Sequence, residues 1–292
     1  MNELDSAFAQ IGSGELEVSR EGVVQLKAVV LSQFCLTDQS LALAPTIVEL
    51  VSDHHAAAVA DLLALVGLMV DPGVEGPAGL RESVRGVLAE CLPAVYEMLD
   101  SPEANVRRES VHVLSSLGPR EVSVSEFRRR LGSELDAEAR SDLIFALSSV
   151  DSAAGGSAAL PYIWDESPGV SVAALVAISK GRQVWASEYT DRLLSLLPLY
   201  RKLLNETWTN TPLTDLIGGL LGNGQTDVLI DILRNGLMAG GEGGQEALWS
   251  TEEIGDALPS SRSAFVPALL SVSTDVTMSR SVGILLSEWG IR

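Results

Sequence analysis

The clearest pattern of apolar and polar positions lies between Leu92 and Gly118, where two amphipathic helices follow each other across a short polar turn. In the second helix, the positions on the apolar face are three or four residues apart, as one helical face requires. They are Val106, Ser110, Val113, Leu114 and Leu117. The turn Asp100-Ser101-Pro102 predicts Ser101 as the N-cap and Pro102 as the first helical residue. At the other end, Gly118 predicts a left-handed stop.

Similar helical patterns cover the rest of the chain, and no stretch alternates apolar and polar residues as a strand would. Residues 1–14 are expected to form a short leader or a partial helix. The other expected helices span about 20–36, 40–52, 55–70, 78–91, 93–100, 103–117, 123–133, 137–150, 157–164, 169–180, 186–205, 212–222, 225–237, 245–257, 262–272 and 276–288. The sequence therefore predicts an all-α fold.

The helical pattern recurs at intervals of 31 to 33 residues. Arg107 and Leu114 return 33 residues later as Arg140 and Leu147, and the next copy has Ile178 in place of the leucine, 31 residues further on. An interval of this length, with two helices in each unit, is typical of an α-solenoid. Weaker copies lie upstream and downstream, over residues 57–68, 215–220 and 286–290.

The segment DSPEANVRRESVHVLSSLG, residues 100–118, resembles the second-helix consensus of HEAT repeats, particularly the short bacterial kind also called phycobilisome-lyase-type repeats. The likeness rests on the acid-proline turn, the Val-Arg pair and the closing Leu-Gly. The whole chain is similar to HEAT-repeat proteins of high-GC bacteria. The resemblance implies a right-handed α-solenoid of about six to eight helix pairs. Its repeats would be regular over about 93–181 within residues 1–205, and degenerate repeats would continue the same solenoid over 206–292.

The charge of the chain narrows the class of partner. It carries 39 acidic and 20 basic residues, a formal net charge of −19, and residues 1–100 hold fifteen acids against four bases. Binding to phosphates needs a cationic surface, so general nucleic-acid binding is disfavoured. The acidic surface either serves ordinary solubility or steers a basic partner toward the protein.

No motif in the sequence predicts a catalytic centre, a cofactor site or a metal site. His54-His55 are adjacent, so they do not share a helix face, and Asp53 is interpreted as the cap of the following helix. The glycine-rich stretch 239–244 lacks the Lys-Ser/Thr of a phosphate loop and is expected to be a loop between helices. With three histidines in the chain, little capacity for general-base catalysis is expected.

The location of the protein is predicted from three features. Cys35 and Cys91 have no metal-ligand spacing, so we expect free, buried thiols in a reducing compartment. The first twenty residues lack the basic and apolar regions of a signal peptide, and no apolar run is long enough to span a membrane. We therefore expect a cytoplasmic protein without a membrane contact.

The sequence offers a small set of candidate partner-binding residues. Seven are named, because they lie on the expected second helices or are aromatic residues of the C-terminal half: Arg107, Arg108, Glu109, His112, Arg140, Trp164 and Trp185. The HEAT resemblance implies that the second helices line a concave face, on which Arg108, Glu109 and His112 would be exposed. In that family the repeat's arginine commonly pairs with an acid of the neighbouring repeat. The cluster Arg128-Arg129-Arg130 is interpreted as a solvated face with ion pairs between repeats.

These features favour a non-catalytic scaffold or adaptor that holds another, basic protein on its concave face. An immunity or antitoxin role, or a place in an accessory complex, would fit such a scaffold. The alternative is an enzyme on the same repeats, such as a glycosylase that excises alkylated bases from DNA, with Trp164-Asp165 or Trp185 in its groove. Bilin-lyase activity, which the second name of the repeats suggests, has no specific pigment site in this sequence.

Overall fold

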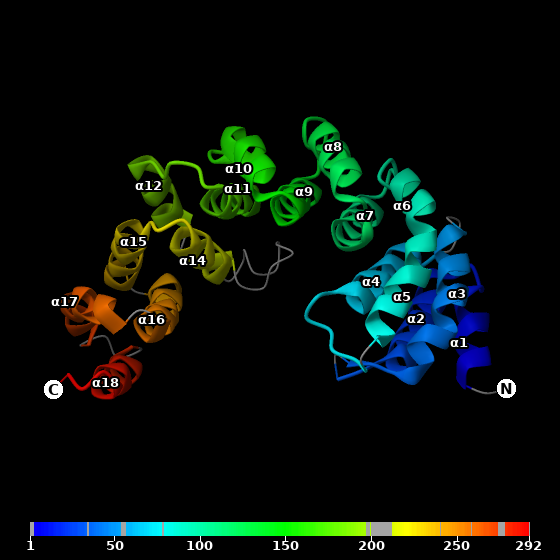
Figure 1. Cartoon of the computed structure of the whole chain (residues 1–292), viewed down its shortest axis with the longest axis horizontal. Helices are drawn as coiled ribbons and strands as arrows, with labels where there is room; N and C mark the ends of the chain where they lie inside the picture. Colours follow the sequence, from blue (N-terminus) through cyan, green and yellow to red (C-terminus); the bar gives the residue numbers. More distant parts are fainter. Residues whose placement is uncertain are drawn as a thin grey trace. The chain divides into compact units, whose positions relative to one another are not determined.

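The computed structural model describes residues 3–33, 35–53, 57–77, 79–196, 199, 212–239, 241–257, 259–273 and 278–291. Over these residues the chain is built of α-helices joined by short turns, with one two-stranded hairpin (Figure 1). The all-α prediction is therefore confirmed. Within the described ranges, no helix is both long enough and apolar enough to cross a membrane.

The helices pack into two compact units, Met1–Ala139 and Arg140–Arg292. The division falls inside one helix, α9 (Ala137–Val150). Unit 1 and unit 2 are described separately below.

Unit 1 is a stack of short helices around an aliphatic core. They are α1 (Glu3–Ile11), α2 (Leu16–Val30), α3 (Asp38–Ser52), α4 (Val59–Val70), α5 (Leu80–Leu88), α6 (Leu92–Met98), α7 (Ala104–Leu117) and α8 (Arg120–Leu131). Helix α1 packs on α2, α3 on α5, and α4 on α7. The central helix is α4, since Leu62, Leu63, Leu65 and Met69 are almost fully buried around its circumference. A helix that is apolar on all sides is stable only when neighbours cover it.

A small hairpin interrupts the helices of unit 1 where a helix was expected. The expected helix 20–36 ends at Val30, and β1 (Leu31–Ser32) pairs antiparallel with β2 (Cys35–Leu36). The helix ends because Leu31 is extended, with φ −128° and ψ 126°, and the hairpin turn that follows contains Gln33 in a left-handed conformation with φ 49°. The Leu36 N–H donates to the Glu75 carbonyl at 2.8 Å, which joins the segment after α4, residues 71–77, to the hairpin. These long-range bonds explain why the apolar local pattern alone predicted a longer helix.

Unit 2 is also built of α-helices, which range from 8 to 17 residues. They are α10 (Ser152–Ala159), α11 (Pro168–Lys180), α12 (Ser187–Leu196), α14 (Pro212–Gly222), α15 (Thr226–Ala239), α16 (Gly241–Ala257), α17 (Arg262–Val272) and α18 (Ser279–Glu288). Among the described residues, 3₁₀ turns lie at Ala89–Cys91 in unit 1 and at Leu160–Tyr162 and Pro259–Ser261 in unit 2. Helix α11 packs against both α10 and α14, and every residue from Gly169 to Ser179 is buried.

Glycines allow this close packing in unit 2. A Cβ atom built on Gly219 of α14 would lie 2.8 Å from the backbone nitrogen of Lys180 at the end of α11. A Cβ on Gly156 of α10 would lie 2.9 Å from the Cα of Gly181. Both distances are too short for any side chain, so these helices approach as closely as backbones permit.

Several predicted helix ends are wrong in detail. Helix α7 begins at Ala104 with Glu103 as its N-cap, two residues later than the turn suggested. Gly118 has φ −67° and ψ 149°, so it is extended and not left-handed. Residues 241–244 begin α16 and do not form a loop, and Asp53 ends α3 instead of capping the helix after it. His54 and His55 lie outside the described residues.

Candidate protein-binding site

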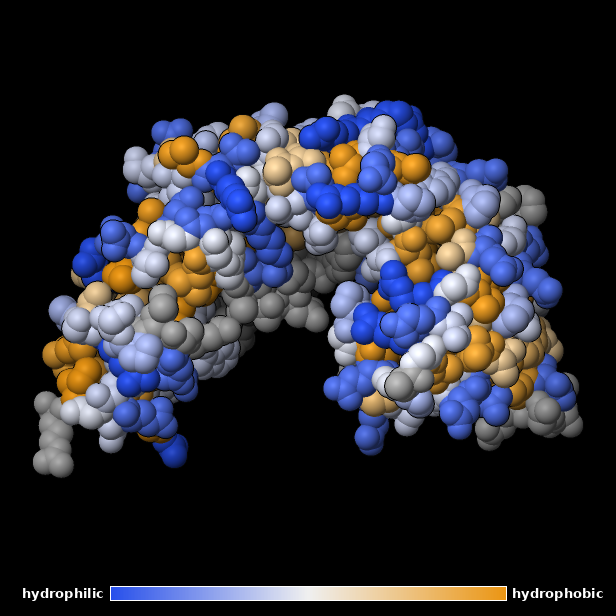
Figure 2. All heavy atoms as spheres, in the orientation of Figure 1, coloured by the Kyte–Doolittle hydropathy of each residue, from blue (hydrophilic) through white to orange (hydrophobic). Residues whose placement is uncertain are grey.

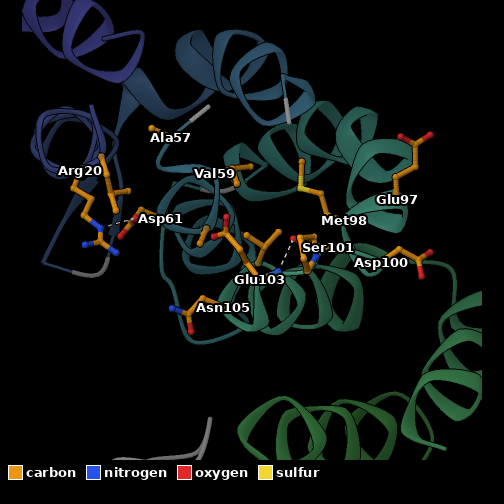
Figure 3. A pocket seen from close by; sticks show the side chains of 14 residues that line it. Arg20, Ala57, Val59, Asp61, Glu97, Met98, Asp100, Ser101, Glu103 and Asn105 are labelled. Atoms are coloured by element: carbon orange, nitrogen blue, oxygen red, sulfur yellow. Dashed lines mark hydrogen bonds and ion pairs between the residues drawn. The ribbon is translucent and has the colours of Figure 1, made fainter. Parts of the chain in front are cut away.

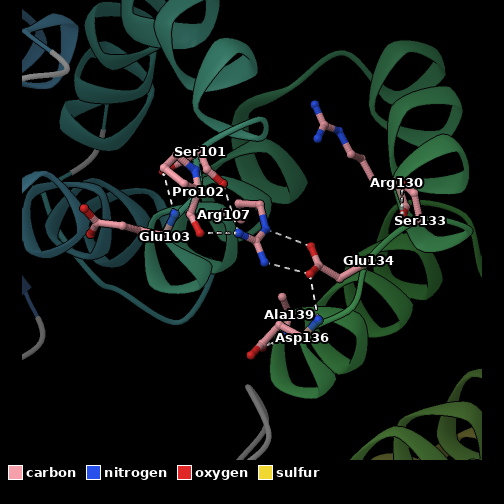
Figure 4. Close-up of polar contacts among 9 residues, drawn as sticks. All are labelled: Ser101, Pro102, Glu103, Arg107, Arg130, Ser133, Glu134, Asp136 and Ala139. Carbon is pink, nitrogen blue, oxygen red and sulfur yellow. Dashed lines mark hydrogen bonds and ion pairs between the residues drawn. The ribbon is translucent and has the colours of Figure 1, made fainter.

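The turn before α7 is held by Arg107 (Figure 4). Its Nε and Nη2 donate to the two carboxylate oxygens of Glu134 at 2.9 and 2.7 Å, while Nη1 donates to the Ser101 and Pro102 carbonyls at 2.9 and 3.1 Å. Glu134 also accepts the Asp136 N–H at 2.9 Å. One guanidinium thus joins the turn before α7 to the turn before α9 in a bidentate pair.

The same turn recurs in unit 2 one repeat later. Arg140 Nη1 donates to Asp165 at 2.9 Å, and the other carboxylate oxygen of Asp165 accepts the Ser167 N–H at 2.9 Å. In unit 1, Ser101 Oγ accepts the Glu103 N–H at 3.2 Å in the equivalent place. Arg107 of α7 and Arg140 of α9 therefore each pair with an acid in a turn further along the chain, before α9 and before α11 respectively. Their guanidinium groups are engaged within the protein.

The contacts of Glu134 in the turn before α9 shift the pKa of its carboxylate. Burial alone would raise its pKa, but hydrogen bonds from Arg107 and from the Asp136 N–H lower the pKa below its ordinary value overall. The same pair raises the pKa of Arg107, chiefly through its hydrogen bond to Glu134. The pair is therefore fully charged at neutral pH.

The remaining candidates on α7 are half-buried, so the expectation of exposure is wrong for them. Arg108 pairs with Glu138. His112 Nδ1 lies 3.8 Å from Glu109, and its ring packs against α4, where a Cβ on Gly67 would lie 2.8 Å from that nitrogen. Contacts with the neighbouring helix and turn cover this face of α7. Val113 is fully buried as expected, whereas Leu117 is half-buried.

The two tryptophan candidates differ in their environments. Trp164 is 57% exposed, and the Arg192 guanidinium lies 5.6 Å from the centre of its ring. Trp185 is 9% exposed, and its Nε1 donates to Thr190 Oγ1 at 2.9 Å. Trp164 thus remains available to a partner, while Trp185 is part of the unit 2 core.

The basic cluster on α8 is paired within unit 1. Figure 2 shows strongly hydrophilic residues over this helix, with apolar residues among them. Arg129 is 58% exposed and bonds to Glu126, while Arg130, 12% exposed, reaches both Glu126 and Asp100. Hydrogen bonding by Arg129 is the main reason that the pKa of Glu126 is lowered. The interpretation as a solvated face with ion pairs agrees with these contacts.

Unit 1 also contains a groove whose lining residues are not among the candidates selected from the sequence (Figure 3). Its volume is about 560 Å³, and it lies between α2, the start of α4 and the turn that joins α6 to α7. Its apolar lining is contributed by Leu16, Ala57, Val59, Ala60, Met98 and Val106. Because these residues come from three distant segments, 16–20, 57–61 and 97–106, only the folded chain brings them together.

The charged residues of the groove are mostly acidic. Asp61, Glu97, Asp100 and Glu103 line it, and Arg20 is the one basic side chain among its described lining residues. Figure 3 places Arg20 and Asp61 on one side, and Glu97 and Asp100 on the other. Arg20 Nε donates to Asp61 at 3.2 Å, and Arg20 Nη1 donates to Glu17 at 3.1 Å. The acid excess of residues 1–100 was the one sequence signal that pointed to this region.

The described residues offer little for catalysis. Among them, no three histidine, cysteine or acidic side chains gather closely enough to hold a metal ion. Cys91 is buried, and burial raises the pKa of its thiol to about 11, so it is protonated at neutral pH and a poor nucleophile.

Comparison with family models and curated proteins assigns the chain to no family. Neither a family model nor a curated protein matches the sequence.

Proposed function

We propose that the chain is a non-catalytic scaffold that binds another protein, and that the partner is basic. In this proposal the helices are HEAT-like repeats, stacked as a right-handed solenoid whose second helices line a concave face. The observation that carries the proposal is the acid-lined groove of unit 1, formed by α2, α4 and the turn before α7.

The repeated turn supports the repeat architecture. Arg107 with Glu134 and Arg140 with Asp165 make equivalent pairs at the recurring interval, each between one second helix and the turn before the next. Side chains that contact only neighbouring repeats are what a solenoid requires.

The charge distribution supports a basic partner. The described lining of the groove has four acids and one arginine. Most of it comes from residues 1–100, which contain fifteen acidic and four basic residues. Such a surface raises the association rate of a cationic partner through long-range attraction, which salt screens. A groove with this charge would repel a phosphate backbone, so the glycosylase alternative is not favoured.

The test begins with capture of partners from the native host on the immobilised chain, followed by identification and purification of what is retained. Association of the purified partner is then measured at rising salt. We expect the on-rate to fall with salt, and Glu97→Lys to lower the on-rate more than it raises the off-rate. Glu288→Lys, which changes the same charge on α18 of unit 2, is the matched control and should have a smaller effect on the on-rate.

Two results would contradict the proposal. Salt-independent association would remove its electrostatic part. Duplex-DNA binding at physiological salt, or excision of alkylated bases by the purified chain, would replace the scaffold with the enzyme alternative.

A further inference from the structure

We propose that the groove of unit 1 takes a basic, extended segment of the partner, and that a guanidinium or ammonium group of that segment replaces Arg20 on Asp61. This inference rests on the proposed function and deepens it, because it names the chemistry that the groove recognises. Arg20 would then be an internal stand-in for the partner's cation.

The Arg20–Asp61 pair is suited to exchange. Its two side chains are 45% and 39% exposed, so water and salt screen the attraction between them. Exposed pairs of this kind contribute little to stability, and one cation can replace another on the carboxylate at little cost. Arg20 also keeps its contact with Glu17, which is 82% exposed, and this carboxylate can hold the arginine when Asp61 is released.

The rest of the groove matches a chain of alternating basic and apolar residues. Val59 and Met98 lie between the two acidic sides in Figure 3 and offer an apolar surface. Asp100 and Glu103 stand at the turn before α7, both exposed, and Figure 3 places Asp100 across the apolar surface from Asp61. In a segment with a cation on either side of an apolar side chain, the cations would pair with the acids on the two sides of the groove. The apolar side chain would pack on the surface between them. Asp100 also contacts Arg130, but its side chain is 70% exposed and can bind a second cation.

The test uses a fluorescein-labelled nonapeptide of alternating arginine and leucine, and the same peptide with citrulline, which is neutral, in place of arginine. Binding to the full chain is measured by fluorescence anisotropy at low and at physiological salt. We expect the arginine peptide to bind, and the citrulline peptide to bind at least tenfold more weakly. Binding of both peptides with equal affinity would overturn the role of charge.

Two substitutions with opposite expected signs test the exchange. Arg20→Gln frees Asp61 and should tighten binding of the arginine peptide by about two- to fivefold, the range that an exposed ion pair corresponds to. Asp61→Asn should weaken binding by a similar factor. An improvement in Arg20→Gln cannot come from damage to the fold, so the pair of variants separates recognition from stability.

The matched controls remove the same charges elsewhere in unit 1. Arg128→Gln removes one exposed positive charge on α8, and Glu82→Gln removes one exposed negative charge on α5. If Arg128→Gln tightens binding as much as Arg20→Gln does, the effect is one of net charge and the inference is wrong. Absence of binding to the wild-type chain at low salt would overturn it as well.

The outcomes also separate this inference from the proposed function. If a purified partner binds but is indifferent to Arg20→Gln and Asp61→Asn, the scaffold stands and the groove inference fails. If the peptides behave as expected while no partner is retained from the host, the groove chemistry stands and the scaffold proposal fails.

Discussion

Helices α7 and α11 occupy equivalent places in the repeat pattern, yet they are stabilised in different ways. Helix α7 buries five of its residues, including Val113 and Leu114, and carries charged side chains on the rest of its surface. Helix α11 buries every residue from Gly169 to Ser179, and none of these is charged. The first is joined to its surroundings by long charged side chains, and the second by close contact with its neighbours.

This difference indicates which region can serve a partner. Ion pairs such as Arg107–Glu134 span turns and leave surface open beside them, and the groove of unit 1 lies at the start of α7. Around α11, glycines bring α10 and α14 close enough to exclude even a methyl group. We therefore assign binding to the α7 region and a purely structural role to the α11 region.

The largest expected loss of stability comes from truncating buried leucines, which α7 and α9 both contain. Leu114→Ala in α7 and Leu147→Ala in α9 should each destabilise the protein by about 2–5 kcal/mol, because both leucines are fully buried and would leave cavities. Urea unfolding followed by circular dichroism measures this. A loss below about 1 kcal/mol at either position would mean that the surrounding helices collapse into the space.

A glycine pair in α14 tests the close packing around α11. Gly219→Ala should lower the free energy of unfolding by about 1–3 kcal/mol, since the alanine Cβ would clash with the Lys180 backbone. The adjacent Gly218 is exposed, with no atom within 4 Å of a built Cβ, so Gly218→Ala should gain up to about 1 kcal/mol of helix stability. Thermal unfolding of the two variants compares them directly. Equal stabilisation by both would contradict the tight contact.

Loss of the charged contact at α7 should cost less than loss of a core leucine. Arg107→Ala should destabilise by about 1–3 kcal/mol at pH 7, because it leaves Glu134 charged and 7% exposed. The pKa of Glu134 is lowered in the folded protein, so the contribution of the pair is complete above the ordinary carboxyl pKa of about 4.3. It is lost as the pH falls through the lowered value.

The difference between wild type and Arg107→Ala should therefore shrink as urea unfolding is repeated from pH 7 down to pH 3. The raised pKa of Arg107 lies far above this range and has no influence there. A difference that stays constant with pH would show that Arg107 contributes through packing and not through charge.

The smallest effect is expected on the exposed face of α8. Arg129→Ala should change stability by no more than about 0.5 kcal/mol, since its side chain is 58% exposed and Glu126 keeps its contact with Arg130. Thermal unfolding of this variant is a baseline for Arg107→Ala. A loss as large as that of Arg107→Ala would remove the distinction between surface pairs and pairs that join turns.

The helices were largely predictable because their signals are local. Regular apolar spacing placed the helix 137–150 at the observed bounds of α9, and it placed α7 within a residue of its start. The predicted helix bounds were wrong where contacts between residues far apart in the chain determine the local structure. Leu36 pairs with Glu75, and Gly244 packs within the unit 2 core near Met278, so neither a longer helix nor a glycine loop forms there.

The candidate site was less predictable than the fold. Charge and exposure on a single helix selected Arg107, Arg108 and His112, but the folded chain engages all three in contacts inside unit 1. The groove depends on residues from Leu16 to Val106 that meet only after folding. Local sequence patterns do not predict contacts between residues far apart in the chain. Only the acid excess of residues 1–100 indicated where the groove lies.

The most direct test of the account is hydrogen–deuterium exchange of the whole chain with and without the arginine–leucine peptide. We predict slower exchange at residues 57–61 and in the turn 99–105, which line the groove, and no change in the loop 181–186 that follows α11. Slower exchange in the loop after α11, with none at the groove, would contradict the assignment of binding to the α7 region.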